Sequence, residues 1–347
     1  MENFIIKDEN ALYFEVGYSC DNALFLAFGE QGYFITDGRY ETEAKEFIQH
    51  DKYAVEILIS RELIQTARTI LKKHENSTLV YNPQEFSVFA FEKLTENLKI
   101  NFLPKPNFHQ EKRIIKSEAE IALIHESQKL NFKAFAKFAK FLSQKGVNCA
   151  ESYLHFKSQG FLSDKGALDL SFNPIVGINK NAAKPHALPS KDKLQKGDLL
   201  LFDAGLKYKR YCSDMTRTGY FGKNGIRFSK EQKFKNTQLQ KIYDIVLKAQ
   251  ECAIKGAKPG MLACEVDALA RNVIEKAGFG KYFVHSTGHG IGLDIHELPI
   301  IASKSQTTLQ EGMVFSIEPG IYIPNHYGVR IEDLVVLEAK GARVLGI

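Results

Sequence analysis

The fold is decided by the stretch Leu199-Leu200-Leu201-Phe202-Asp203-Ala204-Gly205, together with Tyr211-Cys212-Ser213-Asp214-Met215-Thr216 shortly after it. Each stretch is an apolar, strand-forming run that carries one acid. If the two runs form a hairpin closed by a four-residue loop at 207–210, Asp203 and Asp214 lie directly opposite each other on one face, with Cβ atoms about 5 Å apart. A single acid in a strand is usually an edge or turn residue, but two acids in register indicate a shared ligand site.

A second pair of acids repeats the arrangement further along the chain. Glu318 and Glu332 are symmetric about Asn325, so they are also expected to face each other across a hairpin. A bulge at Pro319-Gly320 is expected to loosen that register. Four carboxylates in one place repel one another unless cations lie between them. Two divalent ions balance four carboxylates, and the sequence therefore predicts a two-metal site.

A glycine-rich segment, residues 285–297, reads HSTGHGIGLDIHE and holds three of the ten histidines. Its glycines allow tight backbone approach and unusual dihedrals, which suit a histidine aimed at a fixed point. A phosphate-binding glycine loop is the competing interpretation, but no lysine follows and the histidines would be unexplained. His186, which follows Lys184-Pro185, is ambiguous by itself. The remaining histidines are expected at surface or capped positions: His50, His74, His109, His125, His155 and His326.

The predicted ligand set is rich in oxygen and includes an imidazole. Such a site favours manganese, cobalt, iron or magnesium over a structural zinc, which prefers Cys and His ligands. Two ions roughly 3.5–4 Å apart would hold a bridging hydroxide and polarise a carbonyl group. The residues therefore predict metal-assisted hydrolysis, with two divalent ions as cofactors. Mn²⁺ is the first expectation, and Co²⁺, Fe²⁺ and Zn²⁺ are the alternatives.

Residues 1–111 alternate short apolar runs with helix-like stretches, which indicates a small α/β domain. The stretch 101–110, with Pro104 and Pro106, is expected to be a linker or an edge segment. Strands are expected at 23–28, 33–36, 55–59 and 79–82, and helices at 41–50, 63–74 and 86–97.

Residues 112–347 are expected to form a second domain, of the α+β class. Ser117 and Glu120 are spaced as a capping box, which opens a long helix that runs to about Ser143 and closes at Gly146. Strands gathered between helices without strict alternation favour α+β. The other helices are expected at 229–254 and 263–277, and the strand-like blocks at 199–205, 211–220, 314–322 and 328–337.

The composition narrows the class of protein. The chain has 347 residues, 44% of them hydrophobic and 25% charged, and it has no apolar run of the roughly eighteen residues that would predict a membrane span. Its start is a poor signal peptide, and its five cysteines form no CxxC pair, which favours reduced thiols in a cytoplasmic protein. The net charge of +5 comes from scattered Lys and Arg residues, so nucleic-acid binding is not expected.

The candidate ligands together resemble the ligand set of the pita-bread metallopeptidases, a family that includes methionine aminopeptidase, prolidase and aminopeptidase P. The resemblance runs from about Lys112 to the C-terminus and implies a C-terminal pita-bread domain. A motif at Ile35-Thr36-Asp37-Gly38-Arg39-Tyr40 extends it, less specifically, into residues 1–111, which look like the N-terminal domain of prolidases and creatinase. The segments around the ligands that carry the resemblance are Ser213-Asp214-Met215-Thr216-Arg217-Thr218, Thr287-Gly288-His289-Gly290-Ile291-Gly292, Glu318-Pro319-Gly320 and Arg330-Ile331-Glu332-Asp333.

The resemblance implies a role for each of five metal ligands. Asp203 would bind one metal ion, and His289 and Glu318 would bind the other. Asp214 and Glu332 would bridge both ions. Glu318 would also move the proton of the attacking water.

The resemblance also implies residues that act on the substrate. His186, His285 and His296 match positions where this family places histidines that contact the substrate and stabilise the tetrahedral intermediate. Arg330 matches an arginine of the proline-specific members, whose implied role is to orient Glu332 or the substrate.

The presence of an N-terminal domain indicates which member of the family this chain resembles most. Methionine aminopeptidases commonly lack a domain like residues 1–111, so the resemblance favours an Xaa-Pro peptidase. We expect a metallo-aminopeptidase, a homodimer by resemblance, that removes the first residue from peptides with proline in the second position; a prolidase that splits Xaa-Pro dipeptides is the alternative. A non-catalytic peptide-binding protein on the same fold and a metal-free hydrolase of the creatinase kind are disfavoured, because all five ligands are present. One departure is Arg210, at a turn where relatives often have glycine, which leaves the shape of that loop open.

Overall fold

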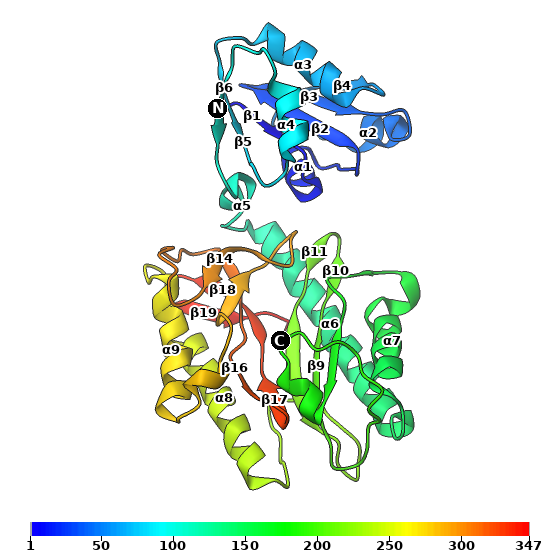
Figure 1. The fold of residues 1–347 in the computed structure, drawn as a ribbon, viewed down its shortest axis with the longest axis vertical. Helices are drawn as coiled ribbons and strands as arrows, with labels where there is room; N and C mark the ends of the chain where they lie inside the picture. Colours follow the sequence, from blue (N-terminus) through cyan, green and yellow to red (C-terminus); the bar gives the residue numbers. More distant parts are fainter. Residues whose placement is uncertain (1, 347) are drawn as a thin grey trace. The chain divides into compact units, whose positions relative to one another are not determined.

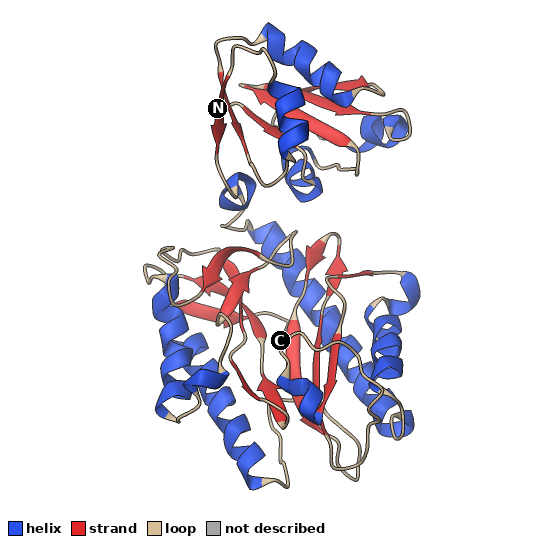
Figure 2. Cartoon of the chain, in the orientation of Figure 1, coloured by secondary structure: helices blue, strands red, loops and turns tan. Residues whose placement is uncertain are grey.

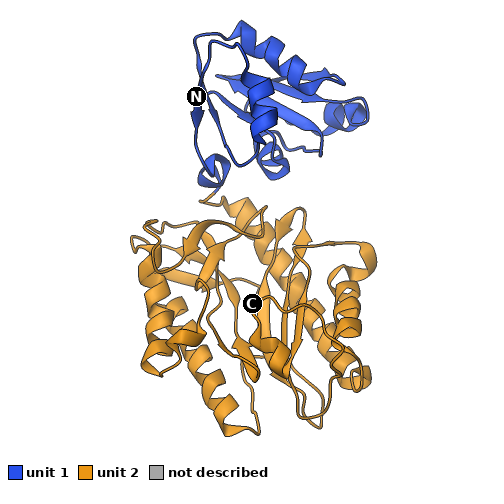
Figure 3. Ribbon diagram, viewed as in Figure 1, with its two compact units in different colours: residues 1–113 blue, residues 114–347 orange. Residues whose placement is uncertain are grey.

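The computed structural model describes residues 2–346, whose helices and strands are shown in Figure 2. The chain divides into two compact units, Met1–Arg113 and Ile114–Ile347 (Figure 3). Within the described residues each unit encloses two apolar cores of its own.

The described strands of the first unit form one sheet in the order β4-β3-β2-β1-β5-β6 (Figure 1). The predicted alternation of strands and helices is confirmed, although α1 was not predicted. The strands are β1 (Phe4–Ile6), β2 (Ala23–Phe28), β3 (Gln31–Thr36), β4 (Ala54–Ile59), β5 (Thr78–Tyr81) and β6 (Asn101–Pro104). The helices are α1 (Glu9–Val16), α2 (Glu41–Phe47), α3 (Leu63–Lys73), α4 (Val88–Thr95) and α5 (Phe108–Lys112).

Alternate residues of these strands face opposite sides of the sheet. Phe4 and Ile6 enter one core with α1 and α5, whereas Ile5 enters the other core with α3 and α4. Because helices cover both faces, the inner strands are apolar on both sides. The segment predicted as a linker or edge contains β6, which is an edge strand of the sheet.

Four of the described helices frame the second unit: α6 (Glu118–Lys145), α7 (Glu151–Leu162), α8 (Thr237–Gly256) and α9 (Ala263–Lys276). The predicted capping box is present, because Ser117 Oγ accepts from Glu120 N–H at 3.3 Å and Glu120 Oε2 accepts from Ser117 N–H at 2.8 Å. Gly146 is the C-cap of α6, as predicted. No helix within residues 2–346 has both the length and the apolar composition that a membrane span needs.

Helix α8 begins later than the sequence pattern predicted. The start was expected at Ser229, with Gln232 three residues on, but the helix begins at Thr237 behind the N-cap Asn236. Asn236 Oδ1 accepts from two N–H groups of the first turn, at 2.9 and 3.0 Å. These N–H groups have no partner within the helix, so the residue that satisfies them sets the helix start.

Replacing Asn236 by alanine is expected to lower the free energy of unfolding by about 1 kcal/mol, because both N–H groups lose their acceptor. Ser229→Ala is the matched control: the Ser229 hydroxyl donates to Glu231 O in an exposed loop, and its loss should change stability by less than about 0.5 kcal/mol. Urea unfolding of the two variants measures the difference. A larger loss for Ser229→Ala than for Asn236→Ala would contradict this account of the helix start.

The described strands of the second unit form four sheets, in the orders β11-β10-β7, β12-β9-β8, β14-β13-β15-β18-β19 and β16-β17. Helices α6 and α7 pack on β8, β9 and β12 around one core, while α8 and α9 pack on β15 to β18 around the other (Figure 1). The predicted α+β class of this unit is confirmed. The strands are β7 (Asp169–Leu170), β8 (Ile175–Ile178), β9 (Leu199–Ala204), β10 (Leu206–Tyr208), β11 (Tyr211–Cys212), β12 (Met215–Tyr220), β13 (Gly288–Gly290), β14 (Glu297–Ile301), β15 (Val314–Ile317), β16 (Gly320–Ile323), β17 (Tyr327–Arg330), β18 (Asp333–Glu338) and β19 (Gly341–Val344).

The hairpin that carries Asp203 and Asp214 has a different register from the predicted one. Asp203 lies opposite Thr216 rather than opposite Asp214. Tyr208 faces Tyr211, so the turn holds two residues instead of the expected four, and every facing pair is shifted by two positions. Because side chains alternate with a period of two, this shift keeps both aspartates on one side of the hairpin.

Lys209 and Arg210 form that turn, with φ values of +47° and +73°. Positive φ at both central residues matches the twist of a two-residue hairpin. Arg210 thus adopts the left-handed conformation that glycine reaches most easily, and the tight turn keeps its shape without a glycine.

The second pair of acids keeps the predicted register. Strand β15 pairs with β18, and β16 pairs with β17, in one continuous register in which Glu318 and Glu332 are opposite. The strand pairing is interrupted at the two glutamates, but the register is the same on both sides of the interruption. The loosening expected from Pro319-Gly320 is therefore wrong, because the proline lies in the interruption, where there is no ladder bond for it to break.

Candidate metal centre

Three of the four candidate acids lie at interruptions between strands, and the fourth lies near the end of β9. Asp214 lies between β11 and β12, Glu318 between β15 and β16, and Glu332 between β17 and β18. Other segments hold the backbone at these interruptions. Glu318 N–H donates to Thr287 O at 2.7 Å, and Glu332 N–H donates to Thr216 O at 3.1 Å. The acids therefore lie on a fixed backbone although they are outside regular strands.

His289 lies at the centre of β13, between two glycines that neighbouring backbone approaches closely. A Cβ added to Gly288 would lie 1.9 Å from Ser316 O, and one added to Gly290 would lie 2.1 Å from Leu298 O. The tight approach predicted for this segment is therefore confirmed. The unusual dihedrals are not, because none of the glycines of HSTGHGIGLDIHE has a positive φ.

One nitrogen of the His289 ring is left to face the acids. Nδ1 lies 3.0 Å from Gly290 O and donates its proton there. Nε2 lies 3.3 Å from Glu318 Oε1 and 3.7 Å from Asp214 Oδ2. Burial lowers the pKa of His289, so the ring is neutral near pH 7 and its Nε2 lone pair is directed at the carboxylates.

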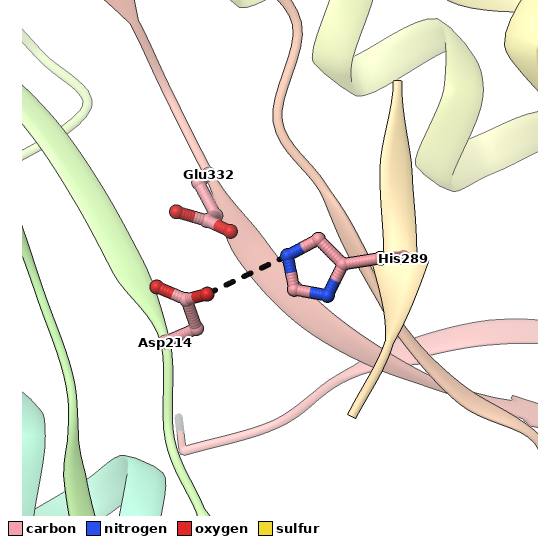
Figure 4. A group of neighbouring side chains, drawn as sticks. All are labelled: Asp214, His289 and Glu332. Carbon is pink, nitrogen blue, oxygen red and sulfur yellow. Dashed lines mark ion pairs between the residues drawn. The ribbon is translucent and has the colours of Figure 1, made fainter. Parts of the chain in front are cut away.

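The side chains of Asp214, His289 and Glu332 point toward one another from three separate segments (Figure 4). Each offers one ligand atom, and these atoms all lie within 4.8 Å of one another. All three residues are buried. Such a spacing suits a shared cation.

Mutual repulsion and burial hold protons on the carboxyl groups when no cation is present. Burial raises the pKa of Asp214 well above its usual range, and the charges of Glu332 and Asp203 raise it further. The pKa of Glu332 is raised in the same way, first by burial and then by Glu318. Burial also raises the pKa of Glu318 to about 7, against the lowering effect of Arg330.

Two buried oxygens of the cluster, Asp203 Oδ1 and Asp214 Oδ1, have no hydrogen-bond partner among the described residues. A buried acceptor rarely stays unpaired in a folded protein. Crowded carboxylates with unpaired oxygens, beside a neutral imidazole, form a donor set that suits divalent cations. The residues present therefore fit a divalent metal.

Arg330 provides a permanent positive charge beside the acids. Its Nη2 donates to Asp203 Oδ2 at 2.6 Å, and its Nε donates to Thr216 Oγ1 at 3.0 Å. The Thr216 hydroxyl in turn donates to Glu332 Oε2 at 2.7 Å. Arg330 thus orients Asp203 directly and Glu332 through Thr216.

His285 is tied into the same network through a tyrosine. Arg330 Nη1 donates to the Tyr322 hydroxyl, and that hydroxyl donates to His285 Nε2, both at 2.8 Å. His285 Nδ1 donates to Ser286 O at 2.7 Å. Burial, helped by Arg330, lowers the pKa of His285 to about 4, which keeps the ring neutral. Both ring nitrogens are therefore used inside the protein.

No role was predicted for Thr216, Ser316 or Tyr322. Ser316 donates its hydroxyl to Glu318 Oε1 at 3.2 Å, so all three residues touch the ligand network. Their spacing was an available signal. Thr216 is two residues after Asp214, while Ser316 and Tyr322 are two before and four after Glu318. Strand periodicity, continued through the interruptions, would place each of them on the same face as its acid.

All nine candidate residues line one cavity of about 640 Å³: Asp203, Asp214, His289, Glu318, Glu332, His186, His285, His296 and Arg330. Phe172, Leu188 and Ile300 contribute apolar wall. His155 of α7 lines the cavity too, although it was expected at the surface. The same expectation is wrong for His109, which is 3% exposed within the first unit.

Comparison with known proteins relates this cavity to a family. Residues 122–339 match the model of metallopeptidase family M24. The Xaa-Pro dipeptidase of Pyrococcus furiosus is 33% identical over 350 residues, which cover 99% of this chain and 92% of that protein. The structure of an Xaa-Pro dipeptidase from Bacillus anthracis is similar with a TM-score of 0.89 at 32% identity, over 99% of this chain and 92% of that one. The structure of an X-Pro aminopeptidase from Thermotoga maritima is similar with a TM-score of 0.86 at 27% identity, over 100% of this chain and 96% of that one.

These similarities span both units. They confirm the predicted fold, a pita-bread domain preceded by a smaller α/β domain. The chain belongs to metallopeptidase family M24, in its branch of Xaa-Pro peptidases.

Proposed function

We propose that this chain is a two-metal aminopeptidase that removes the first residue from peptides with proline in the second position. Membership of its family makes it a metal-dependent peptidase. The observation that carries the proposal is the buried cluster of Asp214, His289 and Glu332, with unpaired carboxylate oxygens beside it. A cation would satisfy such a cluster while leaving its acids charged.

In this proposal Asp203 binds one metal ion, His289 and Glu318 bind the other, and Asp214 and Glu332 bridge both. The distance of 3.3 Å between His289 Nε2 and Glu318 Oε1 supports their sharing of one ion. The unpaired Oδ1 atoms of Asp203 and Asp214 support ligation from the opposite hairpin. When bound, the ions would polarise the scissile carbonyl and lower the pKa of water.

The protein's own groups would place the substrate and move its protons. Glu318, whose carboxylate accepts from the Ser316 hydroxyl, would hold the proton of the attacking water and pass it to the leaving amine. His186 and His296 line the cavity and would donate to the developing oxyanion. His285 would act through Tyr322, because both of its ring nitrogens already have partners.

The charges of the cavity favour longer peptides over dipeptides. Of the described residues that line it, Arg330 is the one lysine or arginine. Its guanidinium already donates to Asp203 and Thr216. An Xaa-Pro dipeptide would bring a free carboxylate beside the proline, and a buried carboxylate without a cation is costly. A longer peptide has a neutral amide there, and Leu188 and Ile300 offer it apolar contact.

A comparison of Xaa-Pro-Xaa, Xaa-Pro and the dipeptide amide Xaa-Pro-NH₂, with the same manganese loading, tests this choice. We expect kcat/KM for the tripeptide to exceed that for the dipeptide by at least about tenfold, or ~1.4 kcal/mol. The amide is the matched control, since it removes the charge without adding a residue, and it should recover most of the loss. A dipeptide that is cleaved as fast as the tripeptide would make the chain a prolidase. No turnover of any of the three after metal loading would contradict the catalytic proposal itself.

The prolidase alternative is favoured by the similarity to Xaa-Pro dipeptidases over nearly the whole chain, at 33% identity for the Pyrococcus furiosus protein and 32% for the Bacillus anthracis structure. A non-catalytic peptide-binding protein on the same fold is the candidate from another class. Such a protein has no need to keep crowded acids and unpaired oxygens buried in one cavity. The substrate comparison separates all three candidates.

A further inference from the structure

A buried ion pair outside the candidate ligand set lies next to the cavity. Lys116 Nζ is 2.5 Å from Glu297 Oε1, and the two side chains are 2% and 1% exposed. Neither residue lines the cavity, and the proposed chemistry uses neither of them. The pair therefore needs an explanation of its own.

Glu297 shapes the loop that carries His296. It follows His296 directly and is the first residue of β14. Its carboxylate lies inside the turn, because a Cβ added to Gly292 would be 2.7 Å from Glu297 Oε1. Glu297 also pairs with Gly290, where the register shifts after His289. The carboxylate thus fills the inside of the loop that joins the two histidines.

The geometry of those two histidines depends on this loop. The ring centroids of His289 and His296 are 4.3 Å apart, with the rings edge to face. His289 is held by its neighbours in β13, whereas His296 lies at the end of the loop. A change in the loop would therefore move His296 first.

Lys116 is anchored to the strand that leads into the site. Its N–H donates to Gly312 O at 2.9 Å, and its neighbour Ile115 forms a bridge with Met313. Strand β15 begins at the next residue, Val314, and leads to Glu318. The lysine thus connects the backbone before one candidate ligand to the loop of His296.

A buried ion pair is weak evidence for a role in stability, because an apolar pair of similar volume is often as stable. A role in fixing the position of a neighbouring side chain explains the pair better, because Glu297 is next to His296, which must be directed at the substrate in our proposal. We propose that Lys116 and Glu297 are positioning residues that aim His296 at the substrate. This inference rests on the proposed function, in which His296 contacts the oxyanion.

A double-mutant cycle between Lys116→Met and His296→Ala tests the inference. If Lys116 acts through His296, Lys116→Met should lower kcat/KM for the tripeptide roughly ten- to a hundredfold in the wild-type background, with manganese content unchanged. In the His296→Ala background the same substitution should change kcat/KM by less than about twofold. Losses that multiply in the double variant, or no loss in the single one, would overturn the proposal.

Lys52→Met is the control for removing a lysine from a buried carboxylate in the other unit, although the Lys52 side chain is itself 44% exposed. Lys52 pairs with the fully buried Glu15 in the first unit, and its loss should leave kcat/KM unchanged. If Lys116→Met does not fold, Lys116→Met/Glu297→Gln removes both charges together and enters the same cycle. Lys116→Arg keeps the cation and is expected to retain most of the activity that Lys116→Met loses. If Lys116→Arg were as impaired as Lys116→Met, the result would count against positioning.

A measurement that needs no turnover separates this inference from the proposed function. The ring ¹³C–¹H resonance of His296, assigned by its loss in His296→Ala, should shift in Lys116→Met and stay in place in Lys52→Met. An unshifted His296 resonance would overturn the positioning role even if the enzyme is active. A shifted resonance in a protein that cleaves no Xaa-Pro peptide would uphold the link between the pair and His296 and reject only the peptidase function.

Discussion

Asp214→Asn is expected to reduce peptidase activity by at least about a thousandfold, which corresponds to ~4 kcal/mol in the activation barrier. The substitution keeps the shape of the side chain but removes a charge that, in our proposal, both metal ions share. Among residues 2–346, Asp214 Oδ1 has no hydrogen-bond partner and Oδ2 faces His289 Nε2 at 3.7 Å, so the side-chain contacts described there do not explain such a loss. Steady-state kinetics and metal analysis of the purified variant measure the two effects, and bound manganese should fall below two ions per chain.

Asp192→Asn is the matched control, because this aspartate pairs with Lys180 at the surface of the same unit. It should retain activity and metal. Glu332→Gln, the other proposed bridge, should behave as Asp214→Asn does. Two manganese ions per chain in either bridge variant would contradict the ligand assignment, even if activity were lost.

The same Asp214→Asn substitution is expected to stabilise the metal-free protein, and to do so more strongly at pH 8 than at pH 5.5. The unfolded carboxyl has a pKa of about 3.9, whereas burial and neighbouring acids raise the pKa of folded Asp214 well above that value. Between these two pKa values the folded wild type binds a proton that the unfolded chain has lost. Its stability therefore falls as pH rises, by ~1.4 kcal/mol per pH unit for one full proton. Asparagine does not titrate, so we expect the variant's advantage to grow with pH across this range, by at most ~3.5 kcal/mol for one proton over about 2.5 pH units.

Urea unfolding of chelator-treated wild type and Asp214→Asn at the two pH values measures this change. Taking the difference between the proteins cancels the titration of shared groups that do not contact Asp214, such as the buried His109 of the first unit. Manganese should reverse the order at pH 8, because the wild type binds it more tightly. A stability difference that shrinks as pH rises would show that the acids are not held protonated in the metal-free fold. The expected result, in which the asparagine variant is the more stable, would make the acid cluster a case where a functional site costs stability.

The four candidate acids were expected together because each pair lies inside a local pattern, whereas only the resemblance to the family separated His289 from His285 and His296. Asp203 and Asp214 interrupt apolar runs, and Glu318 and Glu332 are symmetric about a turn, so simple strand geometry brings each pair together. The first register was wrong because turn length is set by the left-handed conformation of Arg210, which a sequence without glycine does not reveal. The shared face survived the error, since the true turn is shorter by an even number of residues.

Contacts between distant segments were not predictable in the same way. Tyr322 and Thr216 have ordinary strand positions, and only the folded chain shows that Arg330 reaches both. His109 looked like a surface residue because nothing local marks it, yet it packs beside the buried Glu15. The start of α8 was misplaced because two residues with good capping chemistry compete, and Asn236 satisfies the first turn.

The second unit is built as two halves, each with its own core, and the acids come from hairpins on both. Asp203 and Asp214 belong to the hairpin whose strands pack on α6 and α7, while Glu318 and Glu332 lie between strands that pack on α8 and α9. Metal ions shared by the two hairpins would cross-link the two halves, closing a long loop of the chain much as a disulfide does. Without the metal, the hydrogen bond from Arg330 to Asp203 and the buried ion pair of Arg217 with Asp333 would still join the halves.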